Sequence, residues 1–158
     1  MYIKNIYGKT PLQIACIEGC VDIVKLLIEN KADVNILNNY NESSLHIACK
    51  KGKLKIVKIL IEHNADVNIK NIYDQTPLHL ACINGYVNIV KLLIKNNADV
   101  NVKNNYRKIP LSCYCGHFKI VKLLIKNKYI VNNVIEYMLM RVLLNYNTNL
   151  KYCDKQST

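Results

Sequence analysis

A seven-residue motif recurs every 33 residues in this chain, and its period constrains the fold more than any other feature. The motif TPLQIAC at residues 10–16 returns as SSLHIAC at 43–49 and as TPLHLAC at 76–82, and a divergent copy, IPLSCYC, occupies 109–115. A constant period of roughly 20 to 50 residues is typical of stacked units, each too small to bury its own apolar face. The sequence therefore predicts a solenoid whose core runs between neighbouring units.

Each copy of this motif predicts a short first helix. In the first unit, Thr10 is a good N-cap residue, and Pro11 stands at the first helical position, where a missing N–H has no cost. Leu12, Ala15 and Cys16 follow at helical spacing, so we expect them to be buried. The equivalent caps are Ser43 and Thr76, and the glycines that end these helices are Gly19, Gly52 and Gly85.

A second apolar motif with the same period predicts a second helix in each unit. The residues that it places on the inward face of the first unit are Ile23, Val24, Leu27 and Ile28. This helix ends at residues 30–31, 63–64 and 96–97, where asparagine tolerates the left-handed conformation. The polar segment that follows has Gly8, Asn41 and Asp74 at equivalent positions, and predicts a tight turn or finger.

This order of motifs resembles the ankyrin repeat. The family pattern of Thr-Pro-Leu-His-x-Ala, a glycine, Ile-Val-x-x-Leu-Leu and a closing Ala-Asp-Val-Asn is present almost whole in residues 71–101. The resemblance covers about residues 2–132. It implies an all-α solenoid of stacked antiparallel helix pairs with projecting β-hairpin-like fingers, and a module that binds other proteins and is not catalytic.

The repeats predict one domain, residues 1–158, that consists of unequal units. We expect complete units at 5–37, 38–70 and 71–103, a divergent unit at 104–134, and a degenerate C-terminal unit or capping helix at 135–158. In the divergent unit, Ile109 replaces the capping threonine and Tyr114 replaces a small alanine, so we expect a shortened first helix. The chain also starts inside a finger, and a decayed fragment of a longer array remains an alternative.

Two sets of residues are candidates for contact with a partner protein. The first is a tyrosine at the same position of each finger, because tyrosine is enriched at interface cores: Tyr7, Tyr40, Tyr73 and Tyr106. The second is the end of each first helix, which varies between copies while the packing positions do not: Ile17, Glu18, Lys50, Lys51, Ile83 and Asn84. Packing of finger against finger is the alternative explanation of the tyrosines.

The net charge of +11 suggests a polyanion as partner, but the residue types weaken that interpretation. All 22 basic residues except Arg107 and Arg141 are lysine, whereas base recognition relies on bidentate arginine. A row of lysines on the second helices leaves an anionic-surface or nucleic-acid binder as the alternative function: Lys25, Lys58, Lys91 and Lys122, flanked by Lys55, Lys95, Lys119 and Lys126. No aromatic residues interleave with this row, so nucleic acid is disfavoured.

The cysteines and histidines predict structure rather than chemistry. Equivalent helices of stacked units lie about 8–10 Å apart, too far for a disulfide, so we expect a buried, reduced series at one repeat position: Cys16, Cys49, Cys82 and Cys115. The cluster at 113–117 lacks the paired spacing of a zinc site. His46 and His79 vary to Gln13 in the first unit, which a catalytic role would not allow. We expect no enzyme activity, metal or cofactor.

The remaining features concern location. No apolar run is long enough to cross a membrane, and the N-terminal residues lack the order of a secretory signal. We expect a cytoplasmic monomer. The abundance of Asn, Ile, Lys and Tyr, all with AT-rich codons, suggests an AT-rich intracellular microbe or virus, so that action in a host cytoplasm is a further possibility.

Overall fold

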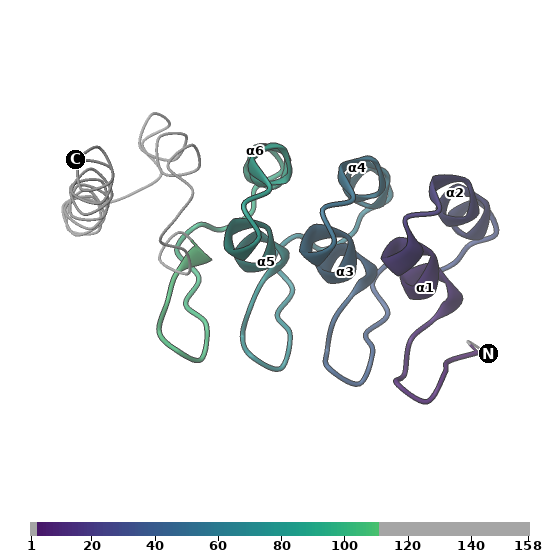
Figure 1. The fold of residues 1–158 in the computed structure, drawn as a ribbon, viewed down its shortest axis with the longest axis horizontal. Coiled ribbons are helices and arrows are strands. Elements are labelled where there is room, and N and C mark those ends of the chain that lie inside the picture. The colour runs from purple at the N-terminus through teal and green to yellow at the C-terminus, as the bar shows by residue number, and fades with distance from the viewer. Residues whose placement is uncertain (1–2, 111–158) are drawn as a thin grey trace, which may run out of the picture.

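The computed structural model describes residues 3–110, and these form three helix pairs with a finger before each pair and one after the last. The helices are α1 (Pro11–Glu18), α2 (Val21–Glu29), α3 (Ser44–Lys50), α4 (Leu54–Glu62), α5 (Pro77–Ile83) and α6 (Val87–Lys95). Figure 1 shows α1, α3 and α5 side by side in one layer and α2, α4 and α6 in a second layer. The fingers extend from the first layer, on the side away from the second (Figure 1).

The predicted all-α solenoid is confirmed for this part of the chain. The fingers are hairpin-like turns rather than paired strands, since residues 3–110 contain no β-strand. Two backbone hydrogen bonds close the second finger, from the Asn38 N–H to the Glu42 oxygen at 3.1 Å and from the Asn41 N–H to the Asn38 oxygen at 3.0 Å. The unit boundaries stay a prediction.

The first helices begin at the predicted caps. In the first unit, the Thr10 hydroxyl accepts the Gln13 N–H at 3.2 Å, while the Gln13 side-chain oxygen accepts the Thr10 N–H at 3.1 Å. This reciprocal pair satisfies two of the N–H groups that a helix start leaves without partners. Ser43 forms the same pair with His46.

Backbone conformation in the turns agrees with the sequence except after α2, where the left-handed residue is Lys31 and not Asn30. The left-handed residues that follow the second helices are Lys31, Asn64 and Asn97, with φ of 62°, 62° and 64°. In the fingers the left-handed positions are Gly8, Asn41, Asp74 and Arg107. Glycine, asparagine and aspartate tolerate this conformation best, so the sequence signal for the first three fingers was sound.

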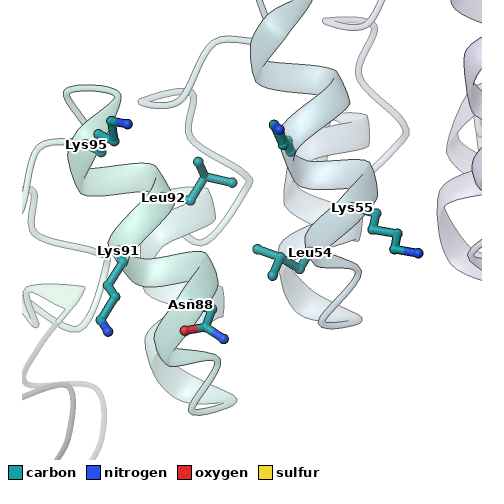
Figure 2. Close-up of a pocket in the computed structure, with 7 residues that line it drawn as sticks. Leu54, Lys55, Asn88, Lys91, Leu92 and Lys95 are labelled. Carbon is teal, nitrogen blue, oxygen red and sulfur yellow. The ribbon is translucent and has the colours of Figure 1, made fainter.

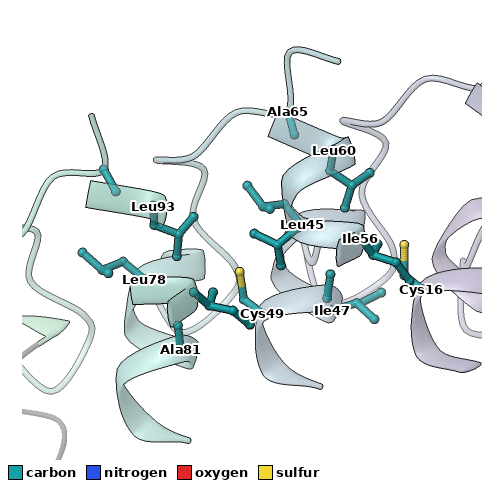
Figure 3. Packing of buried hydrophobic residues seen from close by; sticks show 14 of the residues in the cluster. Cys16, Leu45, Ile47, Cys49, Ile56, Leu60, Ala65, Leu78, Ala81 and Leu93 are labelled. Carbon is teal, nitrogen blue, oxygen red and sulfur yellow. The ribbon is translucent and has the colours of Figure 1, made fainter. Parts of the chain in front are cut away.

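The core is a continuous seam through the units. Leu12, Ala15 and Cys16 are buried as predicted, and the packed helix pairs include α1 with α3 and α3 with α5. Figure 3 shows buried side chains such as Leu45 and Leu78 between neighbouring helices of this seam.

The prediction for the inward face of α2 was wrong at Ile23. This side chain is 51% exposed, whereas its equivalents Ile56 and Ile89 are 0% and 2% exposed. The position is buried only by a preceding unit, and within the described residues no helix packs on that side of α2. Of the four predicted residues in α2, only Val24 is fully buried.

Position 52 requires glycine for two reasons, its left-handed backbone and the close approach of a neighbouring side chain. Gly52 has a φ of +70°, and a Cβ atom added there would lie 2.6 Å from the ring of Tyr86. Tyr86 is the N-cap residue of α6 and packs against the core, so it uses the space that the missing side chain leaves.

Several expectations lie outside the described residues. They are the shortened helix of the divergent unit beyond residue 110, the degenerate unit at 135–158, Cys115, the 113–117 cluster, and Lys119, Lys122 and Lys126.

Candidate functional site

Each finger is organised by an asparagine that stands two residues before its tyrosine. In the second finger, the Asn38 side-chain oxygen accepts the N–H groups of Tyr40 at 2.8 Å and Glu42 at 3.0 Å. Asn5, Asn71 and Asn104 make the same two bonds in the other fingers. Such a bond pattern fixes the turn without any strand. The tyrosine backbone is therefore held in the same way in all four fingers.

These asparagines were missed in the sequence. Asn38, Asn71 and Asn104 are buried, and they recur at the 33-residue period. Their recurrence at this period could have identified these asparagines, but asparagine is so abundant in the chain that the recurrence was not distinctive. A buried asparagine at a fixed repeat position predicts a turn-stabilising role.

Neighbouring fingers are joined through the tyrosine backbones. The carbonyl oxygen of Tyr7 accepts the Asn39 N–H at 3.2 Å, and that of Tyr40 accepts the Ile72 N–H at 3.1 Å. The Tyr73 oxygen accepts the Asn105 N–H at 3.2 Å. Since the same atom is bonded in each finger, the tyrosines lie in register along one edge of the stack. We call this edge the tyrosine row, and it consists of Tyr7, Tyr40, Tyr73 and Tyr106.

The side chains of the tyrosine row remain open to solvent. Tyr7, Tyr40, Tyr73 and Tyr106 are 51%, 44%, 47% and 69% exposed. The Lys9 ammonium lies 5.4 Å from the ring centre of Tyr7, within the range of a cation–π contact. Each ring therefore has one part against the stack and one part available for contact.

The first helices anchor the fingers that follow them. His46 Nε2 lies 3.0 Å from the Gln75 oxygen, and His79 Nε2 lies 3.1 Å from the Lys108 oxygen. In the first unit, the Gln13 side-chain nitrogen donates to the Glu42 oxygen at 3.0 Å. These hydrogen bonds give the histidines a structural role, as the sequence indicated.

The bonding of both histidine rings requires the neutral form. His46 Nδ1 accepts the Ser43 N–H at 3.2 Å, so the proton of the ring resides on Nε2, which donates to a carbonyl. His79 has the same arrangement with Thr76. Burial lowers the pKa of both imidazoles, and the hydrogen bond to the following finger opposes this shift. These rings are structural and stay uncharged at neutral pH.

A third set of bonds joins the loops after the second helices. The Asn35 side chain donates to the Asn64 oxygen at 3.1 Å and accepts the Asp66 N–H at 2.9 Å. Asn68 makes the equivalent pair of bonds to Asn97 and Asp99. The last residue of the Ala-Asp-Val-Asn motif thus links each unit to the next. These bonds and those of the fingers lie in the segments that connect one helix pair to the next, so neighbouring units are linked on the side of the fingers.

The predicted residues at the ends of the first helices differ in accessibility. Those that are exposed are Glu18, Lys50, Lys51 and Asn84. Ile17 and Ile83 are only partly exposed, and Ile17 packs against the core. The Lys50 ammonium pairs with the Glu42 carboxylate at 3.3 Å, which brings the end of α3 beside the second finger. This ion pair joins the two predicted contact surfaces.

Three of the four cysteines within the described residues have packing roles, and the fourth, Cys20, is exposed. Cys16, Cys49 and Cys82 are buried at equivalent positions. Burial raises the pKa of the Cys16 thiol to about 12 and raises that of Cys49 as well, so both stay protonated and unreactive. Residues 3–110 contain no group of three metal-ligating side chains, and none of their helices is long and apolar enough to span a membrane.

The stacked helix pairs and aligned fingers define a helical repeat protein. Two family models match the chain: ankyrin repeats (3 copies) over residues 1–71, and ankyrin repeats (many copies) over residues 60–112. The chain belongs to the ankyrin-repeat family. No curated protein shows significant similarity to it. Ankyrin repeats are generally protein–protein interaction modules and are typically non-catalytic.

Proposed function

We propose that this protein is a non-catalytic binding module that recognises a partner protein through its fingers and the ends of its first helices. The observation that carries the proposal is the tyrosine row, whose four rings are exposed and held in register by backbone bonds between fingers. Exposed aromatic residues at regular positions on a rigid scaffold are typical of protein interfaces.

Rigidity supports this function. The second and third fingers are fixed by buried asparagines, by bonds from the preceding first helix and by bonds to the next finger. A surface that is already ordered loses little conformational entropy on association. Tyrosine adds a large contact area with only two rotatable side-chain bonds. Glu18, Lys50, Lys51 and Asn84 then provide the charged and polar groups that differ from unit to unit.

Packing of one finger against the next accounts for only part of the surface of the tyrosine rings. The bonds that join the fingers use backbone atoms, and each ring keeps 44% or more of its surface exposed. A purely structural role would favour rings buried between fingers. The proposal therefore assigns the exposed part of the rings to a partner.

The alternative function is an anionic-surface or nucleic-acid binder that uses the lysine row. Lys25, Lys58 and Lys91 are exposed on successive second helices, and Lys58 lies 3.8 Å from Glu62. A salt titration separates the two functions, because phosphate contacts make the affinity fall steeply with salt. A slope near zero would remove the alternative. We also propose that the protein is a monomer and that it acts in the cytoplasm. Action in the cytoplasm of a host cell is a more specific form of this proposal.

The test is affinity capture from candidate lysates with mass spectrometry, using the chain and a Tyr40→Ala/Tyr73→Ala/Tyr106→Ala variant. We expect the variant to lose the partner while its thermal midpoint stays nearly unchanged. Leu26→Ala is a matched control, because Leu26 is 58% exposed on the opposite layer. If the midpoint of the triple variant collapses, the tyrosines are structural and the interface lies elsewhere.

A further inference from the structure

An open groove of about 400 Å³ lies between α4 and α6, on the layer of second helices. Its lining residues are Leu54, Lys55 and Lys58 from α4 and Asn88, Lys91, Leu92 and Lys95 from α6. Figure 2 shows Leu54 and Leu92 directed into the space between the two helices, while Lys55 and Lys91 extend away from it. The groove thus has an apolar floor and flexible cationic side chains around it.

The positive charge belongs to this groove and not to the whole layer. At the three equivalent exposed positions, α2 has Asp22, Lys25 and Glu29, α4 has Lys55, Lys58 and Glu62, and α6 has Asn88, Lys91 and Lys95. The net charge of these positions changes from −1 through +1 to +2 along the stack. All of these side chains are exposed, so their charge acts on the solvent side of the groove. The rise in positive charge along the stack is the feature that a complementary ligand would use.

We propose that the groove binds an acidic, amphipathic segment of a partner protein. One apolar side chain of the segment occupies the floor between Leu54 and Leu92, and Asp or Glu residues on either side pair with the lysines. Lys58 and Lys95 lie on different helices, so they can contact carboxylates on both flanks of the segment. The existing contact of Lys58 with Glu62 is long, at 3.8 Å, and both groups are exposed, so it is easily replaced.

The apolar floor distinguishes this ligand from other anions. Proteins that bind single-stranded nucleic acid combine a basic groove with aromatic rings on which the bases stack, and the lining residues include no such ring. A membrane surface is flat and cannot reach a floor that lies between two helices. The site is also separate from the tyrosine row, because the fingers project from the other layer (Figure 1). Its test is therefore independent of the proposed function.

The test is fluorescence anisotropy with a labelled synthetic peptide that has a Leu-Phe centre between flanks of Asp and Glu. We expect saturable binding that weakens with salt. Lys58→Gln/Lys95→Gln raises the Kd by about fivefold, the central value for the loss of two exposed ion pairs. Leu54→Ala also weakens binding, which a purely electrostatic contact would not show. The matched control is Lys25→Gln/Lys103→Gln, which removes the same charge outside the groove and leaves the Kd within about twofold.

Four results would overturn the proposal. The first is the absence of saturable binding to the chain. The second is an equal loss of affinity in the control double variant. The third is tighter binding of polyglutamate, a single-stranded oligonucleotide or phosphatidylserine vesicles than of the peptide, since none of these uses the apolar floor. Loss of peptide binding in the tyrosine triple variant would place the site at the fingers instead.

Discussion

A proline at position 44 should stabilise the protein, because the second unit lacks the proline that begins the first helix of its neighbours. Ser44 is the first residue of α3, where the other two units have Pro11 and Pro77. Its side chain is fully buried, and among the described residues its hydroxyl has no hydrogen-bond partner. A buried hydroxyl without a partner costs about 1–3 kcal/mol of stability.

The local backbone already suits proline. Ser43 has φ −81° and ψ 170°, close to Thr76, which precedes a proline with φ −87° and ψ 166°. A residue before proline requires this extended conformation. The N–H of the first helical residue has no partner within the helix, so proline removes no intrahelical bond. Pro77 is itself buried at the equivalent position, so the stack accommodates the ring.

Two terms set the expected size of the effect for Ser44→Pro. Restriction of the unfolded chain contributes about 0.4–1 kcal/mol, and loss of the hydroxyl contributes about 1 kcal/mol or more. We expect the free energy of unfolding in urea to rise by about 1–3 kcal/mol, with the thermal midpoint rising by at least about 3 °C. Ser44→Ala isolates the hydroxyl term and should give part of this gain. An unchanged or lower free energy of unfolding for Ser44→Pro would refute the reasoning.

Three further perturbations test the scaffold. Gly52→Ala should destabilise by about 2 kcal/mol or more in urea unfolding, because φ is +70° and the new Cβ meets the Tyr86 ring; an unchanged midpoint would contradict this. Burial lowers the pKa of His46 and His79 below 6.5, so unfolding takes up protons and stability should fall as pH drops through about 6.5; replacing both with Gln should flatten the dependence. Asn71→Ala should cost about 1–3 kcal/mol, since two N–H groups lose their acceptor, whereas Asn71→Asp keeps the acceptor and most of the stability; equal losses would exclude the turn role.

The repeat period predicted most of the fold because each unit uses the same helix caps, turn residues and buried positions. Capping residues, left-handed turn positions and buried apolar residues all follow from local sequence signals. Thr10 and its equivalents confirmed the helix starts, and Asn41 and Asp74 confirmed the finger turns. Such signals depend on a residue and its near neighbours, so a single sequence contains them.

Features that depend on neighbouring units were less predictable. Ile23 was placed inward because its equivalents are, but its burial requires a unit on one side of it. The contact of Tyr86 with Gly52 joins two units across 34 residues, and no motif marks it. The exposed fraction of a side chain depends on the units that flank it in the stack, and not only on its position in the repeat motif. Sequence periodicity describes a unit in the middle of an array better than one at its end.

The candidate site was predicted in part. The sequence identified the tyrosine positions, but not the backbone bonds that hold the fingers in register. It also did not identify Ile17 as a residue that packs against the core. The groove between α4 and α6 is formed by side chains of two helices. Only the structure shows that Leu54 of α4 and Leu92 of α6 face the same space.

The most direct test of the account is a tyrosine footprint of the complex with a captured partner. Hydroxyl-radical labelling with mass spectrometry measures the reactivity of each ring with and without the partner. The account predicts that labelling of Tyr7, Tyr40, Tyr73 and Tyr106, the exposed rings of the row, falls on binding. Unchanged labelling of the tyrosine row in a saturated complex would contradict the account.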